Sequence, residues 1–118
     1  QMMMQFIHLN YTERISLSDI AKAGNVSTST ALNLFRNVLN TSPVNYLICY
    51  RLKEAALLLS NTEKKVSAIS LDTGFSNKDY FCRSFKQVYS LTPSEYRRAK
   101  KWEGGHDTST SFISISEK

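Results

Sequence analysis

The fold is decided by a stretch of sequence that occurs twice, about fifty residues apart. Residues 31–46 read ALNLFRNVLNTSPVNY, and residues 81–96 read FCRSFKQVYSLTPSEY. The phenylalanine in the middle of each copy and the proline after it keep the same spacing. An internal repeat fixes the architecture before any single residue is interpreted. Two copies are too few for a solenoid, and two copies of helix, short turn and helix predict a pair of DNA-reading units on one chain.

Helical spacing and turn residues predict an all-α fold with about seven helices. The expected helices cover residues 2–12, 17–23, 28–39, 43–60, 66–73, 78–89 and 93–100. The second helix ends at Gly24 and Asn25, which both tolerate left-handed backbone, and Gly74 begins the matching turn of the second copy. We therefore predict two helix-turn-helix subdomains, residues 1–42 and 62–102, joined by a linker helix over 43–61 and followed by a flexible tail, 103–118.

Capping residues place the beginnings of these helices. Ser16 with Asp19 and Thr92 with Glu95 read as capping boxes, in which side chain and backbone satisfy each other's hydrogen bonds. Ser27 caps the third helix, and its match in the repeat is Ser76; either Ser76 or Asn77 caps the sixth. The linker helix is apolar on nearly every side, which is typical of a helix buried between two layers. Its thiol, Cys49, is expected to be buried with the rest.

The two repeated helices each have an apolar face and a polar face. The apolar residues of the first copy, spaced as on a helix packed against a core, are Ala31, Leu34, Phe35, Val38 and Leu39. The matching places in the second copy are Phe81, Ser84, Phe85, Val88 and Tyr89. The opposite face carries short polar and basic residues, as a recognition helix needs. The candidates for base contacts are Ser29, Thr30, Leu32, Asn33, Lys78, Asp79, Cys82 and Arg83. The candidates for phosphate contacts are Ser27, Thr28, Arg36, Ser76, Asn77 and Lys86.

Several of these candidates have a second interpretation. Arg83 can contact guanine through two hydrogen bonds, or instead contact a phosphate or pair with Asp79 four residues earlier. Asn33 either reads adenine or is an ordinary solvated side chain. Leu32 either meets a thymine methyl group or lies at the edge of the core. Arg51, in the linker helix, is expected to make a structural pair with a carboxylate such as Glu54.

Composition limits the function further. The net charge is +5, but residues 1–102 carry 14 Lys and Arg against 7 Asp and Glu, whereas the tail carries 1 against 3. A basic body suits a polyanionic partner. The two cysteines form no CxxC motif, and no metal ligand set or catalytic constellation stands out, so we expect no cofactor, no metal and no enzymatic activity. No membrane-length apolar run or leader is present, and a cytoplasmic location is expected.

These residues resemble the AraC/XylS type of bacterial transcription regulators, over about residues 3–98. The most specific matches in the second half are Gly74, Phe75, Tyr80, Phe81, Arg83, Phe85, Thr92, Pro93, Tyr96 and Arg97. The resemblance implies two helix-turn-helix subdomains, joined by a linker helix, that together bind double-stranded DNA as a transcription switch. We expect RNA polymerase to be a further partner. The resemblance also implies a separate effector or dimerisation domain, and because the chain begins with Gln we expect it to be part of a longer protein.

The sequence departs from this family's pattern at a few places. Ser70 replaces the usual Ala, Lys65 stands where a helix cap is common, and Ala31 is smaller than usual. The first recognition face has one basic residue, Arg36. The alternative function is a helical protein-interaction module that contacts RNA polymerase or a partner regulator; a steep salt dependence of duplex binding distinguishes the two.

Overall fold

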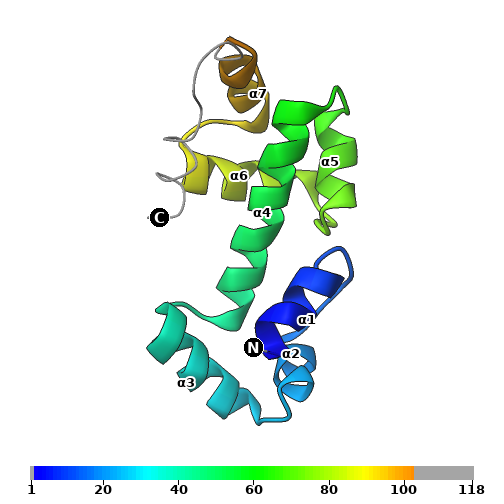
Figure 1. Cartoon of the computed structure of the whole chain (residues 1–118). Helices are drawn as coiled ribbons and strands as arrows, with labels where there is room; N and C mark the ends of the chain where they lie inside the picture. The colour runs from blue at the N-terminus through cyan, green and yellow to red at the C-terminus, as the bar shows by residue number, and fades with distance from the viewer. Residues whose placement is uncertain (1, 103–118) are drawn as a thin grey trace. The chain divides into compact units, whose positions relative to one another are not determined.

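The computed structural model describes residues 2–102, which form seven helices and contain no strand (Figure 1). The predicted all-α class is confirmed for these residues. The helices are α1 (Met2–Asn10), α2 (Leu17–Ala23), α3 (Thr28–Leu39), α4 (Pro43–Asn61), α5 (Val66–Asp72), α6 (Lys78–Tyr89) and α7 (Pro93–Trp102). The chain divides into two units, Gln1–Arg51 and Leu52–Lys118, so α4 begins in the first unit and ends in the second. The expected tail, residues 103–118, lies outside the described residues.

The first unit has its own hydrophobic core. Its buried residues are Met3, Ile7, Ile20, Ala21, Ala31, Phe35 and Leu47, from α1, α2, α3 and the start of α4. The Phe35 ring packs edge-on against Tyr46, with ring centroids 5.8 Å apart. Above this core, the His8 ring stacks on Tyr50 at 4.3 Å, and its Nε2 forms a 2.6 Å hydrogen bond with the Tyr46 hydroxyl. These contacts attach α1 to α4, although the sequence had suggested no role for His8.

The second unit is built around aromatic rings. Phe81 and Phe85 are fully buried on α6, and their centroids lie 5.8 Å apart. Phe85 also stacks on Tyr89 at 4.4 Å and meets Tyr96 of α7 edge-on at 5.3 Å. The aliphatic part of the core is Leu52, Ala55, Ala56, Leu59 and Ile69. Offset and edge-on ring pairs add to the stabilisation that burial alone provides, so α6 is held firmly against its unit.

Both predicted capping boxes are present. The Ser16 hydroxyl accepts from the Asp19 amide at 3.1 Å, and the Asp19 carboxylate accepts from the Ser16 amide at 2.9 Å. Thr92 and Glu95 make the same pair of bonds at 3.2 and 2.9 Å. In each box the backbone hydrogen bond stabilises the charged form and lowers the pKa of the carboxyl group. Lys65 precedes α5 without a side-chain cap, as expected.

In each unit, one arginine stabilises the fold by donating hydrogen bonds to two backbone carbonyls distant in the sequence. Arg51 donates to the carbonyls of Tyr11 and Glu13, both at 2.7 Å, so its expected structural role is confirmed, with backbone carbonyls as the acceptors. Arg97 donates in the same way to the carbonyls of Leu59 and Thr62, both at 3.1 Å. Tyr11 and Glu13 follow α1, whereas Leu59 lies in the last turn of α4 and Thr62 follows it. The carbonyls at the end of a helix have no intrahelical partners, so they are free to accept these bonds. A guanidinium group has enough donors to satisfy two of them at once.

Two other expectations about local structure are corrected, and the backbone at the end of α2 is defined. The first helix ends at Asn10 rather than residue 12, and the Asn10 side chain bonds back to the carbonyl of Phe6 at 2.9 Å. Gly24 has φ −91°, so only Asn25, at φ 58°, is left-handed. Glycine is needed at position 24 for space, because a Cβ there would lie 2.6 Å from Cγ of Met3. Cys49 is exposed, since one side of α4 is left uncovered.

The apolar face predicted for α3 includes more residues than the core of the first unit buries. Ala31 and Phe35 are buried and Leu39 is half-buried, but Leu34 and Val38 are 42% and 69% exposed. They line a shallow groove together with Met3 and Met4 of α1, and no element of the described chain covers it. In α6 the whole predicted stripe is buried or half-buried. Among residues 2–102, no helix is long and apolar enough to cross a membrane.

Candidate nucleic-acid interface

Two helix pairs of equal size form the candidate interface. Helices α2 and α3 have 7 and 12 residues, and helices α5 and α6 also have 7 and 12. In each pair, a residue in left-handed backbone begins the turn: Asn25 at φ 58° and Gly74 at φ 96°. Both second helices also end in a left-handed residue, at Asn40 and Ser90. The repeat in the sequence is therefore a repeat of backbone conformation.

The second turn is one residue longer than the first, and the additional residue is Ser76. Ser27 caps α3 by accepting from the Thr30 amide at 3.2 Å. The equivalent bond in α6 runs from the Tyr80 amide to Oδ1 of Asn77, at 3.0 Å. Asn77 is therefore the cap of α6 and the structural match of Ser27. The alternative that Ser76 caps α6, and its alignment with Ser27, are wrong; Ser76 is an exposed turn residue.

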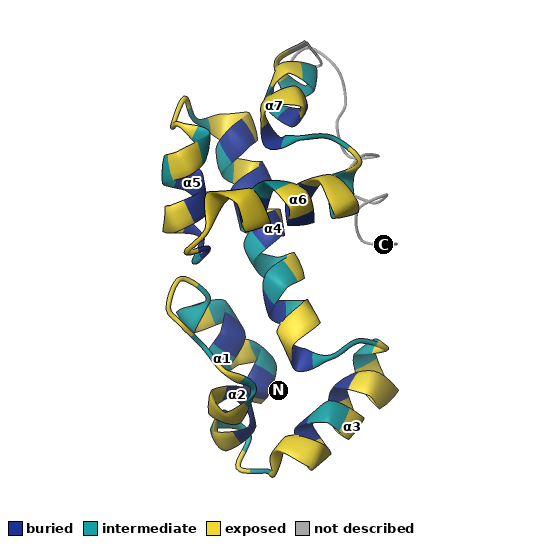
Figure 2. Ribbon diagram, turned by 180° about the vertical axis from the view of Figure 1, so that it is seen from behind, coloured by how far each residue is buried: buried dark blue, intermediate teal, exposed yellow. Residues whose placement is uncertain are grey.

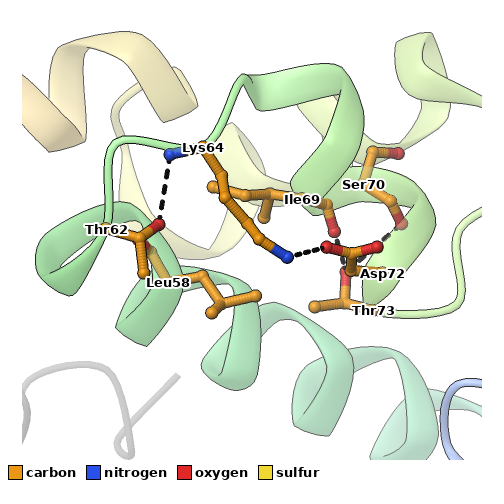
Figure 3. Close-up of polar contacts among 7 residues, drawn as sticks. All are labelled: Leu58, Thr62, Lys64, Ile69, Ser70, Asp72 and Thr73. Atoms are coloured by element: carbon orange, nitrogen blue, oxygen red, sulfur yellow. Dashed lines mark hydrogen bonds and ion pairs between the residues drawn. The ribbon is translucent and has the colours of Figure 1, made fainter.

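Hydrogen bonds around α5 hold the second turn in place (Figure 3). The Thr73 hydroxyl is buried and donates to the carbonyl of Ile69 at 2.8 Å. Lys64, just before α5, forms an ion pair with Asp72 at its end, with 2.5 Å between Nζ and Oδ2. Ser70 is buried, and its hydroxyl has no hydrogen-bond partner within the described chain. The buried hydroxyl of Thr73 thus holds the end of α5, from which the turn into α6 begins.

The outer face of α3 is mostly polar. Ser29, Asn33 and Arg36 are exposed, and Leu32 is half-buried. Figure 2 shows exposed residues, in yellow, along α3. At the start of the helix, Ser27 and Thr28 are also exposed, so this helix terminus is open to solvent. The Thr30 hydroxyl is already engaged, because it accepts from the Ser27 hydroxyl at 3.0 Å. The face offers one full positive charge and several short hydrogen-bonding groups.

The outer face of α6 is much more strongly charged. Lys78, Asp79, Arg83 and Lys86 are all exposed, and Cys82 is half-buried between them. Within residues 2–102, Arg83 forms no ion pair with Asp79; its guanidinium lies 6.0 Å from the ring centroid of Tyr80 instead. Lys86 is close enough to Glu95 to contribute, after the capping bonds, to the lowered pKa of that carboxyl. Three cations against one carboxylate favour an anionic partner.

The structure thus brings the candidates of each copy together at the start and outer face of one anchored helix. The contact candidates chosen from the sequence did not include Tyr80, which is 42% exposed beside Arg83. Its position three residues before Arg83 was the available signal, since side chains at that spacing lie side by side on a helix. Within the described residues, no group of three or more His, Cys, Asp or Glu side chains could hold a metal ion.

Comparison with known proteins identifies relatives of this chain. A helix-turn-helix domain model matches residues 20–99. An uncharacterised HTH-type transcriptional regulator of Bacillus subtilis (strain 168), YdeC, is 40% identical over 96 residues, which are 81% of this chain and 33% of that protein. The lactose operon transcription activator of Staphylococcus xylosus is 34% identical over 94 residues, or 80% of this chain and 34% of that protein. The chain therefore spans about a third of the length of these relatives.

A solved structure of similar sequence has the same fold. It is a transcriptional regulator from Chromobacterium violaceum, described as an AraC-type DNA-binding domain-containing protein, with 31% identity and a TM-score of 0.79. The similarity covers 84% of this chain and 88% of that one. The resemblance seen in the sequence thus extends to the three-dimensional arrangement of the helices.

Proposed function

Because this chain belongs to the AraC/XylS family of helix-turn-helix transcription regulators, we propose that it regulates transcription by binding a specific sequence of double-stranded DNA. The domain is that of a DNA-binding regulator and not of an enzyme. The observation that carries the proposal is the pair of equivalent helices, α3 and α6, each anchored by a buried phenylalanine and each presenting polar side chains to solvent.

The exposed side chains suggest a division of roles along each recognition helix. We assign base contacts to Asn33 and Arg83, because an amide and a guanidinium can each form two hydrogen bonds to one base edge. The further base-contact candidates are Ser29, Thr30, Leu32, Lys78, Asp79 and Cys82. The Thr30 hydroxyl accepts from Ser27, so its own O–H group remains available as a donor.

The phosphate backbone is the expected partner of the remaining candidates. These are Ser27, Thr28, Arg36, Ser76, Asn77 and Lys86. The amides at an exposed helix start bind anions, and the cations of the outer faces add long-range attraction. Because α6 carries more positive charge than α3, the second unit supplies more of the electrostatic affinity. The first unit then discriminates through short polar groups.

We propose that the two recognition helices enter successive major grooves of one duplex. Two equivalent reading units on one chain match the way in which helix-turn-helix dimers read half-sites one helical turn apart. The cytoplasm, where bacterial DNA lies, is the compartment that this function requires. RNA polymerase and a separate effector or dimerisation domain are the protein partners that we propose for the complete regulator.

The alternative function, a protein-interaction module, has one structural feature in its favour. This feature is the apolar groove between α1 and α3, with Leu34 and Val38 exposed at its edge. It does not compete with DNA binding, because the groove and the polar face of α3 are formed by different residues. A protein contact there would add to DNA binding rather than replace it.

The salt dependence of duplex binding tests the proposal. We would select bound sequences from a random duplex library, then measure the affinity of the full chain for a selected site and a scrambled one at 50–300 mM salt. Counterion release predicts a linear fall of log K with log salt, with a slope of about −0.9 per phosphate contact, and tighter binding to the selected site. Equal affinity for both sites and no salt dependence would reject the proposal.

A further inference from the structure

We propose that Tyr80 is a positioning residue, which holds the guanidinium group of Arg83 in the orientation needed to contact a base. This inference rests on the proposed function, because Arg83 reads a base only if α6 enters a major groove. Tyr80 and Arg83 are both exposed, and they lie one turn apart on α6. Side chains three residues apart on a helix lie next to each other on its surface.

The geometry of the pair is that of a weak cation–π contact. Cζ of Arg83 lies 6.0 Å from the centroid of the Tyr80 ring, at the outer limit for this interaction. A contact of this strength restricts where the guanidinium can go without removing it from solvent. The donors of Arg83 therefore remain available for a base edge.

Tyr80 can orient Arg83 because the tyrosine is itself held in place by the core. Its ring meets Phe75 at 6.1 Å, and Phe75, which is 3% exposed, meets Phe81 at 5.0 Å. The Tyr80 amide also bonds to the capping side chain of Asn77 at 3.0 Å. A continuous line of aromatic rings thus runs from the buried core of the second unit to the recognition surface.

Arginine benefits from such support because it is long and flexible. A free arginine loses much rotamer freedom when it binds, and a side chain that is already oriented loses less. The other group able to orient Arg83 is Asp79 on the preceding turn. Within the described residues these two side chains form no ion pair, so Tyr80 is the contact that remains.

The first unit provides an internal comparison. Counted from the caps, Thr30 and Asn33 occupy the places of Tyr80 and Arg83. Asn33 has a short side chain with few rotamers, and the Thr30 hydroxyl is bonded to Ser27 rather than presented to its neighbour. The aromatic ring therefore occurs where this position holds a long cation, Arg83, and is absent where it holds the short Asn33.

The test uses two matched substitutions. Tyr80→Phe keeps the ring face and removes the hydroxyl, whereas Tyr80→Leu keeps apolar contact with Phe75 but has no ring. Each variant of the full chain, alone and combined with Arg83→Ala, would be measured against all single-base variants of the selected site. Urea melts would establish that each variant is folded at the assay temperature.

Tyr80→Leu should reduce discrimination at the base pair read by Arg83 by about two- to five-fold, the range that an exposed cation–π contact supports. Tyr80→Phe should retain wild-type discrimination. In the Arg83→Ala background, Tyr80→Leu should have no further effect, because the two side chains act as one unit. A uniform loss of affinity on all sequences, additive with Arg83→Ala, would overturn the inference.

A second measurement separates this inference from the proposed function. In the protein without DNA, the NMR signal of the Arg83 Nε–H group should shift in Tyr80→Leu and remain in place in Tyr80→Phe. An unchanged signal in Tyr80→Leu would overturn the positioning role, even if Arg83 reads a base. If wild-type protein shows no sequence preference, the proposed function fails, and the NMR result alone decides whether Tyr80 orients Arg83.

Discussion

Replacing Phe85 by alanine should unfold the second unit. Phe85 is fully buried on α6, and its ring contacts the rings of Phe81, Tyr89 and Tyr96. Truncating a buried phenylalanine to alanine costs about 3–5 kcal/mol. A unit of about fifty residues has roughly 2.5–7.5 kcal/mol of stability, at about 0.05–0.15 kcal/mol per residue. The substitution therefore removes most of the stability that this unit has.

Urea titration followed by far-UV circular dichroism and by amide NMR signals would measure the effect. We expect the signals of α5, α6 and α7 to be lost at low urea, while those of α2 and α3 persist. Leu71→Ala is the matched control, because Leu71 is in the same unit and 67% exposed; its effect should stay within about 0.5 kcal/mol. A loss below 1 kcal/mol for Phe85→Ala would show that the aromatic cluster does not hold this unit together.

Further substitutions test the interface and the local structure. Lys86→Ala should weaken binding to all DNA sequences and flatten the salt slope by about 0.9. Arg83→Ala and Asn33→Ala should each relax the preference at one base pair, by about 1–3 kcal/mol. Affinities for a panel of single-base variants of the site, at several salt concentrations, separate these outcomes. Ser70→Ala should raise the free energy of unfolding by about 1–2 kcal/mol, because it removes a buried hydroxyl without a partner; a loss of stability in melts would mean that the hydroxyl is satisfied. The capping bonds lower the folded-state pKa of Glu95, so the ionised carboxylate stabilises the fold fully above the ordinary carboxyl pKa, and this stabilisation is lost as the pH falls through the lowered value. Glu95→Gln should remove this part of the pH dependence of stability in acid titrations. An unchanged titration would contradict this prediction.

Features set by local chemistry were predictable from the sequence. The two capping boxes, the proline at the start of α4 and of α7, and the repeat itself placed nearly every helix boundary within a residue or two. These signals act within one turn of the chain, so no knowledge of the rest of the fold is needed.

Features that depend on distant partners were not predictable in the same way. The periodicity of α3 included Leu34 and Val38 in an apolar stripe, but it could not show that α1 covers only part of that stripe. Arg51 was expected to pair with a carboxylate, and its hydrogen bonds reach backbone carbonyls about forty residues away in the chain.

The position of the cap on α6 required the backbone as well. Ser76 and Asn77 are both good caps by residue type, and only the turn geometry shows that Asn77 takes the role. The outward direction of Asn33, Arg83 and Lys86 followed from the spacing of the apolar residues around them. Their contacts with bases and phosphates remain predictions, since they depend on the DNA.

Footprinting tests the central claim most directly, because that claim is that one chain reads DNA with two recognition helices. Hydroxyl-radical cleavage of a selected site, with the protein at a concentration where it is monomeric, should show two protected patches on one face of the duplex, about 10 base pairs apart. A single short patch protected by one monomer, or protection without sequence preference, would contradict it.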